Sequence, residues 1–293
     1  PFLFIANSWL MVLGVKFFDR LGKSMRTPAR DALISVSINP KRKGLAFGFH
    51  RAMDRTGALF GPLLALIVLY FFPGNFRLVF LLSAIPAAIA VSIIFFAKEI
   101  HHTKNHVGFK NTWNFNKQFY LFLLVIGLFS LGNSSNAFLI LKAREAGISV
   151  LFIPALWMLY NLVCTISSPI FGHLSDQIGK KMIIYISFIY YALIYFAFGF
   201  FNSNIMIWVL FSLYGIYYGL SEGVFRAFVA DLVPSAQRAT AYGLFNTVIG
   251  LALIPASILM GTLWEFFSSS IAFYTSAGFA LAAGALFSFQ KMD

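Results

Sequence analysis

Apolar stretches of about 20 residues recur along the whole 293-residue chain and are separated by short polar turns. Each stretch is long enough to cross the hydrocarbon core of a bilayer as an α-helix. Hydrophobic residues make up 59% of the chain and charged residues 11%, whereas a soluble domain carries about 25% charged residues. A water-soluble fold could not cover so much apolar surface. We therefore predict an all-α, multi-pass membrane protein.

The polar turns between these stretches predict about nine complete membrane spans and one partial span. The partial span covers residues 1–7, and the complete spans lie near 9–38, 43–72, 77–97, 118–141, 149–172, 182–201, 205–231, 236–263 and 268–289. Because the chain begins inside an apolar run, we expect further amino-terminal helices to precede it.

One long hydrophilic segment, residues 98–117, divides the spans into two groups. The division predicts the remainder of an amino-terminal helix bundle over 1–97, a linker over 98–117 and a carboxyl-terminal six-helix bundle over 118–293. The segments PKRKGLAFGF (40–49) and PSAQRATAYGL (234–244) resemble each other. Such an internal repeat is common in transporters. Chance similarity between apolar helices is the alternative.

Lysine and arginine gather in alternate turns, for example at 41–43, at Lys180 with Lys181, and at Arg238. The positive-inside rule then places these turns, the linker and the carboxyl terminus in the cytoplasm. The net charge of +12 is explained by these loops and does not indicate a nucleic-acid partner. We expect a protein embedded in the lipid bilayer of the cytoplasmic membrane, the inner membrane in a bacterium.

One predicted span carries a stripe of charged side chains. At about 100° per residue, these side chains fall within an arc of about 140° of the helix. The stripe contains Lys16, Asp19, Arg20, Lys23, Arg26, Arg30 and Asp31. A charge in hydrocarbon costs at least about 2.5–3.5 kcal/mol, so the stripe must face an aqueous cavity or counter-charges on other helices. A helix lying flat on the membrane surface is the alternative.

Two further charged groups lie inside apolar spans. Arg51, Asp54 and Arg55 share one helix face. Glu222 and Arg226 are four residues apart, so we predict that they pair with each other. A carboxylate within a membrane is a candidate functional group, and Glu222 is our candidate for coupling to protons or solute. A purely structural ion pair is the alternative.

Uncharged polar side chains complete the candidate pathway for solute or ions. Asn133 and Asn136 fall in the predicted span 118–141, and Tyr218 precedes Glu222 by one helical turn. Polar groups on several facing helices are what a solute site requires. Hydrogen bonding between closely packed helices is the alternative.

The segment GHLSDQIGKK, residues 172–181, lies between two predicted spans. Its glycines allow a tight turn, and its aspartate can cap or pair with the end of a neighbouring helix. The segment resembles the signature loop of the major facilitator superfamily at Gly172, Leu174, Asp176, Gly179, Lys180 and Lys181. In that family the aspartate helps to latch the outward-facing state.

A second segment, GALFGPLLA at 57–65, resembles the glycine–proline motif of proton-coupled exporters in that family, with Ala65 where glycine is usual. Arg20 maps onto the arginine of the family's fourth-helix motif. The resemblance implies twelve helices in two pseudo-repeats. It also implies a transport path lined by the spans 9–38, 118–141 and 205–231. We assign conformational gating to Arg51, Asp54, Arg55, Gly57, Gly61, Pro62, Gly172, Asp176, Gly179, Lys180 and Lys181.

The sequence therefore predicts a secondary active transporter that moves a small solute by alternating access. The exporter-like motif favours proton-coupled efflux, as in drug/proton antiporters, and the excess positive charge of the stripe favours an anionic solute. The alternatives are an uptake symporter for sugars, siderophores or peptides, and a non-transporting sensor, assembly partner or inactive truncated product of the same fold.

Other chemistry has little support in the sequence. His101, His102 and His106 lie in the hydrophilic linker without the ligand pattern of a metal site. We find no phosphate-binding loop and no catalytic grouping, so we expect neither an enzyme nor a cofactor or metal. Cys164 lies alone in an apolar stretch and is expected to be a packing residue.

Overall fold

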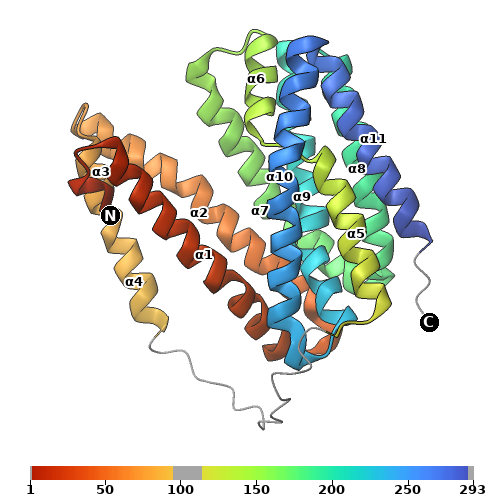
Figure 1. Ribbon diagram of the computed structural model, residues 1–293. Helices are drawn as coiled ribbons and strands as arrows, with labels where there is room; N and C mark the ends of the chain where they lie inside the picture. The colour runs from red at the N-terminus through yellow and green to blue at the C-terminus, as the bar shows by residue number, and fades with distance from the viewer. Residues whose placement is uncertain (1, 95–113, 290–293) are drawn as a thin grey trace.

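The computed structural model describes residues 2–94 and 114–289, and every regular element in these ranges is a helix (Figure 1). The first group consists of α1 (Trp9–Ser37), α2 (Lys43–Phe71), α3 (Phe76–Leu82) and α4 (Ala84–Ile94). The second consists of α5 (Lys117–Gly132), α6 (Ala137–Glu145), α7 (Ile153–Ile178), α8 (Lys180–Phe200), α9 (Asn204–Leu232), α10 (Arg238–Phe266) and α11 (Ser269–Ser288). Most of the predicted linker, including His101, His102 and His106, lies outside the described residues.

Side-chain caps fix where several helices begin. Asn116 accepts a hydrogen bond from the Phe119 amide at 2.8 Å and starts α5. Ser268 accepts one from the Ile271 amide at 3.2 Å and starts α11, and Ser8 caps α1 in the same way. Each cap satisfies one of the amides that have no partner in the first helical turn. These polar residues therefore mark the ends of the apolar runs.

Eight helical segments of the described chain are long and apolar enough to cross a membrane. They are Pro40–Phe71, Phe76–Ile93, Lys117–Glu145, Val150–Ile178, Lys180–Phe200, Asn204–Leu232, Ser235–Phe266 and Ser269–Ser288. Helix α1 has 29 residues, a length of about 43 Å at 1.5 Å per residue, but its charged stripe makes it less apolar than these eight. The prediction of an all-α, multi-pass membrane protein is confirmed.

Helices α5–α11 form a bundle around an aromatic core. Phe122, Tyr191, Tyr195 and Tyr214 are fully or almost fully buried. The rings of Tyr191 and Tyr195 stack with their centroids 4.0 Å apart. Aromatic side chains bury large apolar areas and interlock in offset and edge-to-face contacts. The first helix group packs against the outside of this bundle.

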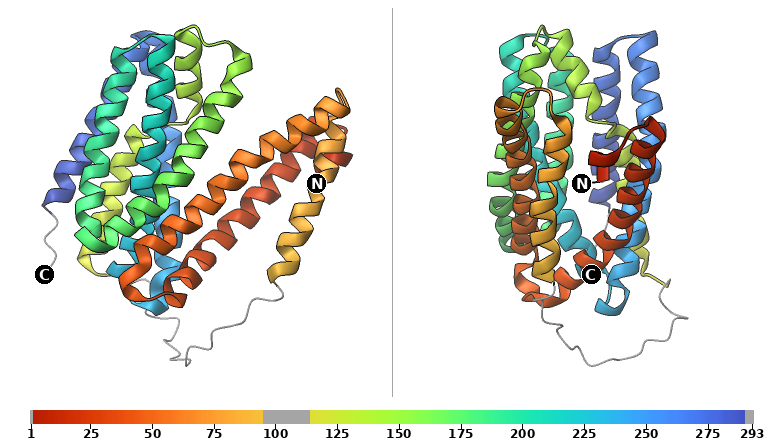
Figure 2. Two further views of the ribbon diagram at one scale, coloured as in Figure 1. Left: turned by 180° about the vertical axis from the view of Figure 1, so that it is seen from behind. Right: turned by 90° about the vertical axis from the view of Figure 1, so that its left-hand side faces the viewer.

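The two helix groups meet at one end and diverge towards the other. In the two further views the pair α1–α2 approaches the bundle where α1 ends and α2 begins, and separates from it towards the start of α1 and the end of α2 (Figure 2). Helix α2 packs mainly against α7 and α9, and α1 packs against α10. We call the meeting region, built from residues 35–48 and 172–180 with Asp231 and Arg238, the closed end.

Two predicted spans are interrupted in the structure. The predicted span 118–141 corresponds to the membrane-length segment Lys117–Glu145, but its helix is not continuous, because the chain leaves helical geometry at 133–136, between α5 and α6. The hydroxyl of Tyr191 donates to the carbonyl of Gly132 at 3.1 Å, which satisfies a carbonyl at the end of α5. The predicted span 77–97 is likewise divided at Ser83 into α3 and α4.

The segment 172–181 is mainly helix and not a loop. Helix α7 continues to Ile178, six residues beyond its predicted end at residue 172, and α8 begins at Lys180. Gly179 alone connects the two helices, with φ of 96°. Side chains other than glycine rarely adopt this conformation, which explains the glycine at this position.

Candidate functional site

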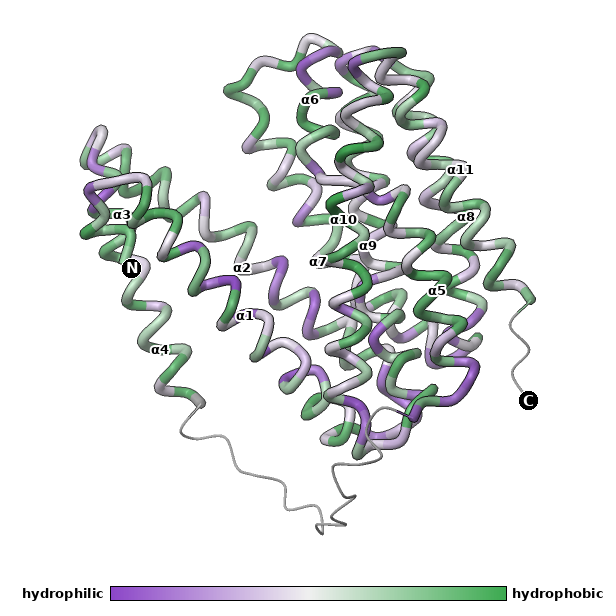
Figure 3. Tube along the Cα trace, in the orientation of Figure 1, coloured by the Kyte–Doolittle hydropathy of each residue, from purple (hydrophilic) through white to green (hydrophobic). Residues whose placement is uncertain are grey.

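A cavity of about 920 Å³ lies between the two helix groups and is lined by α1, α2, α9 and α10. Its lining residues are Arg20, Lys23, Ser24, Arg26, Thr27, Pro28, Arg30, Arg51, Asp54, Arg55, Ala58, Glu222, Arg226, Gly243, Asn246 and Thr247. Hydrophilic segments interrupt the hydrophobic course of α1 and α2 along this region (Figure 3). The charged stripe of α1 thus contributes to a polar cavity, as one of the two predicted placements requires.

Asp31 is the centre of the ion-pair network at the bottom of this cavity, and its carboxylate is completely buried. It accepts a hydrogen bond from Arg226 on α9 at 2.8 Å. Arg30 lies 3.3 Å away and Arg51, on α2, lies 3.7 Å away. One carboxylate therefore holds arginines from three helices, which offsets the cost of burying their charges.

Asp54 forms a second, more exposed centre on α2. Its carboxylate lies 3.1 Å from Arg51, 3.8 Å from Arg30 and 3.8 Å from the Nδ1 of His50. Asp54 therefore offsets part of the positive charge of the neighbouring side chains on α1 and α2. Arg30 and Arg51 are shared between Asp31 and Asp54, so the two carboxylates belong to one network.

Glu222 on α9 pairs with Arg55 on α2, and not with Arg226 as predicted. The Arg55–Glu222 distance is 3.0 Å. The Arg55 guanidinium also lies over the rings of Tyr160 and Tyr218, at 5.4 and 4.9 Å from their centroids. Arg226 instead donates to the backbone carbonyl of Glu222 at 3.0 Å while its Nε bonds Asp31. Partners from other helices thus override the local four-residue spacing.

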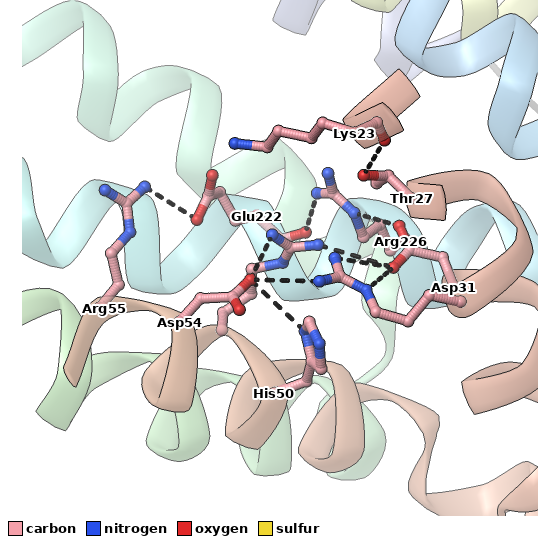
Figure 4. A network of polar contacts seen from close by, with 10 residues as sticks. Lys23, Thr27, Asp31, His50, Asp54, Arg55, Glu222 and Arg226 are labelled. Carbon is pink, nitrogen blue, oxygen red and sulfur yellow. Dashed lines mark hydrogen bonds and ion pairs between the residues drawn. The ribbon is translucent and has the colours of Figure 1, made fainter. Parts of the chain in front are cut away.

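Three cations of the cavity have no such partner. Arg20, Lys23 and Arg26 line the wall formed by α1, and their side-chain nitrogens make no hydrogen bond or ion pair with any described residue. Figure 4 shows the Lys23 ammonium extending past the paired groups with no contact drawn to it. The cavity therefore has a paired floor and an unpaired cationic wall.

Asp176, near the end of α7, contacts the start of α2 at the closed end. Its two carboxylate oxygens accept hydrogen bonds from the backbone amides of Gly44 and Leu45, each at 2.9 Å. These amides belong to the first turn of α2, where the helix dipole favours a negative charge. The prediction that Asp176 caps the end of a neighbouring helix is therefore correct in its geometry.

Two lysines extend this contact to α9. Lys43 Nζ lies 2.8 Å from Asp231 and donates to the carbonyl of Ala230 at 3.3 Å. Lys180 lies 2.8 Å from the other oxygen of Asp231 and 3.5 Å from Asp176. The closed end is thus held by alternating charges from α2, α7, α8 and α9.

Glycines allow the backbones to approach closely at the closed end. A Cβ at Gly44 would lie 2.4 Å from the carbonyl oxygen of Gly172, and a Cβ at Gly172 would lie 2.4 Å from that of Gly44. A Cβ at Gly48 would lie 2.3 Å from the carbonyl of Ser168. Small residues of this kind permit tight helix packing in membranes. The motif glycine Gly172 therefore serves packing, and not a turn.

Some predicted pathway residues lie outside the cavity lining. Lys16 and Asp19 are exposed nearer the start of α1. Asn136 accepts a hydrogen bond from Tyr214 at 2.9 Å, and Asn133 lies 3.5 Å from the Tyr191 hydroxyl. These two amides thus make contacts between helices, the alternative considered above.

The glycine–proline motif of α2 also lies outside the lining. A Cβ placed on Gly57 or Gly61 would meet no atom within 4 Å, and Pro62 is exposed. Lys181 lies at the start of α8, beside Lys180. In this conformation the structure brings Arg51, Asp54 and Arg55 to the cavity and Gly172, Asp176 and Lys180 to the closed end.

Two polar residues of α10 that line the cavity were not predicted from the sequence, nor was the contact that Arg238 makes. Asn246 and Thr247 line the cavity opposite α1. Arg238 donates to the backbone carbonyl of Ser35 at 3.1 Å and joins α10 to the end of α1. Only a helical projection of the otherwise apolar span 236–263 could have placed Asn246 and Thr247 near one face.

Comparisons with known proteins agree with this architecture. The family model of the Major Facilitator Superfamily matches residues 1–121 and again 121–291. An uncharacterised MFS-type transporter of Methanocaldococcus jannaschii is 37% identical over 296 residues, which cover 97% of this chain and 73% of that protein.

Two shorter matches concern proteins with more specific names. A proton-coupled antiporter flippase of Staphylococcus saprophyticus is 26% identical over 138 residues, 46% of this chain and 35% of that protein. A class H tetracycline resistance protein of Pasteurella multocida is 32% identical over 107 residues, 36% of this chain and 26% of that protein. The double family match and the relative from M. jannaschii establish the family. The chain belongs to the Major Facilitator Superfamily of membrane transporters.

Proposed function

We propose that the protein exports a small, negatively charged solute in exchange for protons, by alternating access. The observation that carries the proposal is the charged cavity between the two helix groups. Ion pairs between the groups form its floor, and the Lys43–Asp231 pair joins the groups at the closed end. The cavity volume suits a small molecule. A closure made of ion pairs that can break and re-form suits a protein that opens to each side in turn.

The distribution of basic residues supports one orientation of the molecule in the membrane. Lys41, Arg42, Lys43, Lys180 and Arg238 all belong to the turns or helix starts at the closed end. The positive-inside rule assigns such a region to the cytoplasm. The cavity then opens to the outside, in the conformation from which an exporter releases its solute.

Proton exchange is supported by the position of Glu222 and by two relatives. The relatives are named as a proton-coupled antiporter flippase and a tetracycline resistance protein. Glu222 borders the cavity and holds Arg55 at 3.0 Å, so one carboxylate links cavity water to the α2–α9 contact. Protonation of Glu222 from outside removes the charge that holds Arg55 and weakens closure on the cytoplasmic side. Loss of that proton inside restores the pair.

Transport by purified protein in proteoliposomes tests the proposal. The vesicles are given an acidic lumen and a metabolite extract of the source cells outside, and mass spectrometry identifies the solutes that accumulate. We expect anionic solutes to enter as protons leave. Accumulation that requires an acidic exterior would instead support uptake by symport. If no component accumulates under either gradient, the transporter proposal is wrong.

Two glutamate variants test the role of Glu222. We expect Glu222→Gln to reduce gradient-driven accumulation at least about tenfold, because a glutamine side chain cannot take up and release a proton. Glu265→Gln is the control, since Glu265 is exposed near the end of α10 and does not line the cavity. Unchanged accumulation in Glu222→Gln would assign the coupling to another group.

Thiol labelling tests whether the cavity contains water. Arg26→Cys is made together with Cys164→Ala, which removes the native buried thiol. We expect rapid reaction with a membrane-impermeant reagent added on the side opposite the closed end. Ser187→Cys is the unreactive control, because Ser187 is completely buried in α8. Failure of Arg26→Cys to react from either side would contradict an aqueous cavity.

A further inference from the structure

The cationic wall of the cavity differs from its floor in how its charges are satisfied. On the floor, Arg55 and Arg226 each have a carboxylate at 3.0 Å or closer, and Arg30 and Arg51 have one within 3.3 Å. These pairs need no external anion. On the wall, the three cations of α1 have no carboxylate within ion-pair distance among the described residues. An anionic ligand is the partner that they lack.

The spacing of the wall residues suits a ligand with more than one charged oxygen. Arg20, Lys23 and Arg26 follow one another at intervals of three residues. Each interval advances about 4.5 Å along the helix and turns it by about 60°. The three Cα atoms therefore span about 9 Å along α1, and their side chains project from neighbouring positions on one side of the helix. An anion with a single charge can pair with only some of these three cations, whereas a multiply charged anion can pair with all of them.

A further donor borders the same cavity from α10. Asn246 belongs to the lining, and its side-chain Nδ2 is buried and has no hydrogen-bond partner. A buried amide donor without a partner costs free energy. An oxygen atom of a ligand would satisfy it. The cavity thus offers donors on two sides, guanidinium and ammonium groups on α1 and an amide on α10.

The chemistry of these donors selects one class of ligand. Arginine, lysine and an amide NH₂ all donate hydrogen bonds, and arginine pairs with oxyanions through two parallel bonds. The acidic groups of the cavity, Asp54 and Glu222, are engaged by arginines. A cationic solute therefore meets no free carboxylate here, and a neutral solute leaves the wall charges unpaired. An oxyanion satisfies the donors and the charge together.

We propose that Arg20, Lys23, Arg26 and Asn246 form a binding subsite for an oxyanion with at least two negative charges, such as a phosphate ester, a diphosphate or a polycarboxylate. This inference rests on the proposed transport function and names its solute class. The anion lies between α1 and α10, which belong to different helix groups. Binding therefore draws the two groups together across the cavity.

Binding to the purified protein tests the subsite without requiring transport. Thermal unfolding is followed with inorganic pyrophosphate, citrate or acetate, at constant ionic strength and constant sodium. We expect pyrophosphate or citrate to raise Tm in a saturable manner and acetate to have little effect. The better of the two identifies phosphoryl or polycarboxylate chemistry. Equal responses to all three anions, or no response to any of them, would overturn the proposal.

Paired charge removals locate the site. Lys23→Gln with Arg26→Gln is expected to weaken binding of the responding anion at least about tenfold, as expected for lost charge-assisted hydrogen bonds. Lys41→Gln with Arg42→Gln is the matched control, because it removes the same two charges from exposed positions outside the cavity. Equal weakening by both double variants would show general charge attraction and would overturn the subsite.

Two more variants guard against misfolding and separate the two proposals. Lys23→Arg keeps the charge and is expected to keep binding within about threefold. Asn246→Asp adds a carboxylate opposite the wall and is expected to weaken binding at least about tenfold. Saturable anion binding without any solute accumulation in proteoliposomes would support the subsite and refute transport. Accumulation of neutral or cationic solutes alone would support transport and refute the subsite.

Discussion

Arg226 on α9 bonds Asp31 on α1 at 2.8 Å, across 195 residues of sequence. The pair joins the carboxyl-terminal bundle to the first helix group at the bottom of the cavity. Because Asp31 also lies within 3.7 Å of Arg30 and Arg51, its loss would leave three guanidinium groups with fewer counter-charges. Buried charges without partners are among the most destabilising changes in a protein.

We therefore expect Asp31→Asn to lower the free energy of unfolding by about 3 kcal/mol. Thermal unfolding in detergent measures the change. Asp19→Asn removes the same charge from an exposed position on the same helix and is expected to change the free energy by less than about 0.5 kcal/mol. Similar effects of the two substitutions would mean that the network adds no stability.

Asp176 is expected to stabilise the closed end through its bonds to the amides of Gly44 and Leu45. Asp176→Asn should weaken this closure by about 1 kcal/mol, the size of a typical cap. The readout is labelling of Ser35→Cys in a Cys164→Ala background, since Ser35 is buried at the closed end. The labelling rate should rise about fivefold, whereas Glu265→Gln should leave it unchanged. An unaltered rate in Asp176→Asn would contradict its role.

Gly172 should not tolerate even one added methyl group. A Cβ there would lie 2.4 Å from the Gly44 carbonyl oxygen, so Gly172→Ala must push α7 and α2 apart. We expect a loss of about 1–3 kcal/mol, as for other overpacked sites. Gly57→Ala is the control, because its Cβ would meet nothing within 4 Å. It should leave stability unchanged or raise it by up to about 1 kcal/mol.

The same control examines the glycine–proline motif. If Gly57→Ala folds normally but stops transport, then Gly57 must pack closely in another conformation of the cycle. If transport also remains normal, then the gating role assigned to Gly57 is wrong.

Tyr218 is expected to position Arg55 through its ring and not through its hydroxyl. The guanidinium lies 4.9 Å from the ring centroid. Tyr218→Phe keeps the ring and should retain most of the proton-coupled accumulation. Tyr218→Leu removes the cation–π contact, which contributes about 0.5–2 kcal/mol, and should lower accumulation several-fold. Equal activity in both variants would exclude this positioning role.

The sequence predicted a helix well where a single apolar run is bounded by polar residues at both ends. The span predicted over 9–38 is α1, Trp9–Ser37, and the motif aspartate Asp176 indeed caps a neighbouring helix. The break at 133–136 was missed because its polar residues are too few to distinguish an interrupted helix from a continuous one.

Contacts between distant residues could not be predicted in the same way. Spacing alone paired Glu222 with Arg226, but Arg55 lies 167 residues before Glu222 and takes its carboxylate. Asn246 is one amide in an apolar span, and its importance depends on facing α1 across the cavity. Such partners are set by tertiary packing, which no single helical projection contains.

The single-residue junction at Gly179 has a mechanical consequence. Helix α7 has 26 residues and α8 has 21, and one glycine between them leaves little slack for the two to slide independently. The Lys180–Asp176 contact spans the same joint. A shift of α2 at the closed end would therefore move the α7–α8 pair together and carry the displacement about 39 Å along α7. Separation of the helices at the closed end would thereby help to narrow the cavity at its opposite end.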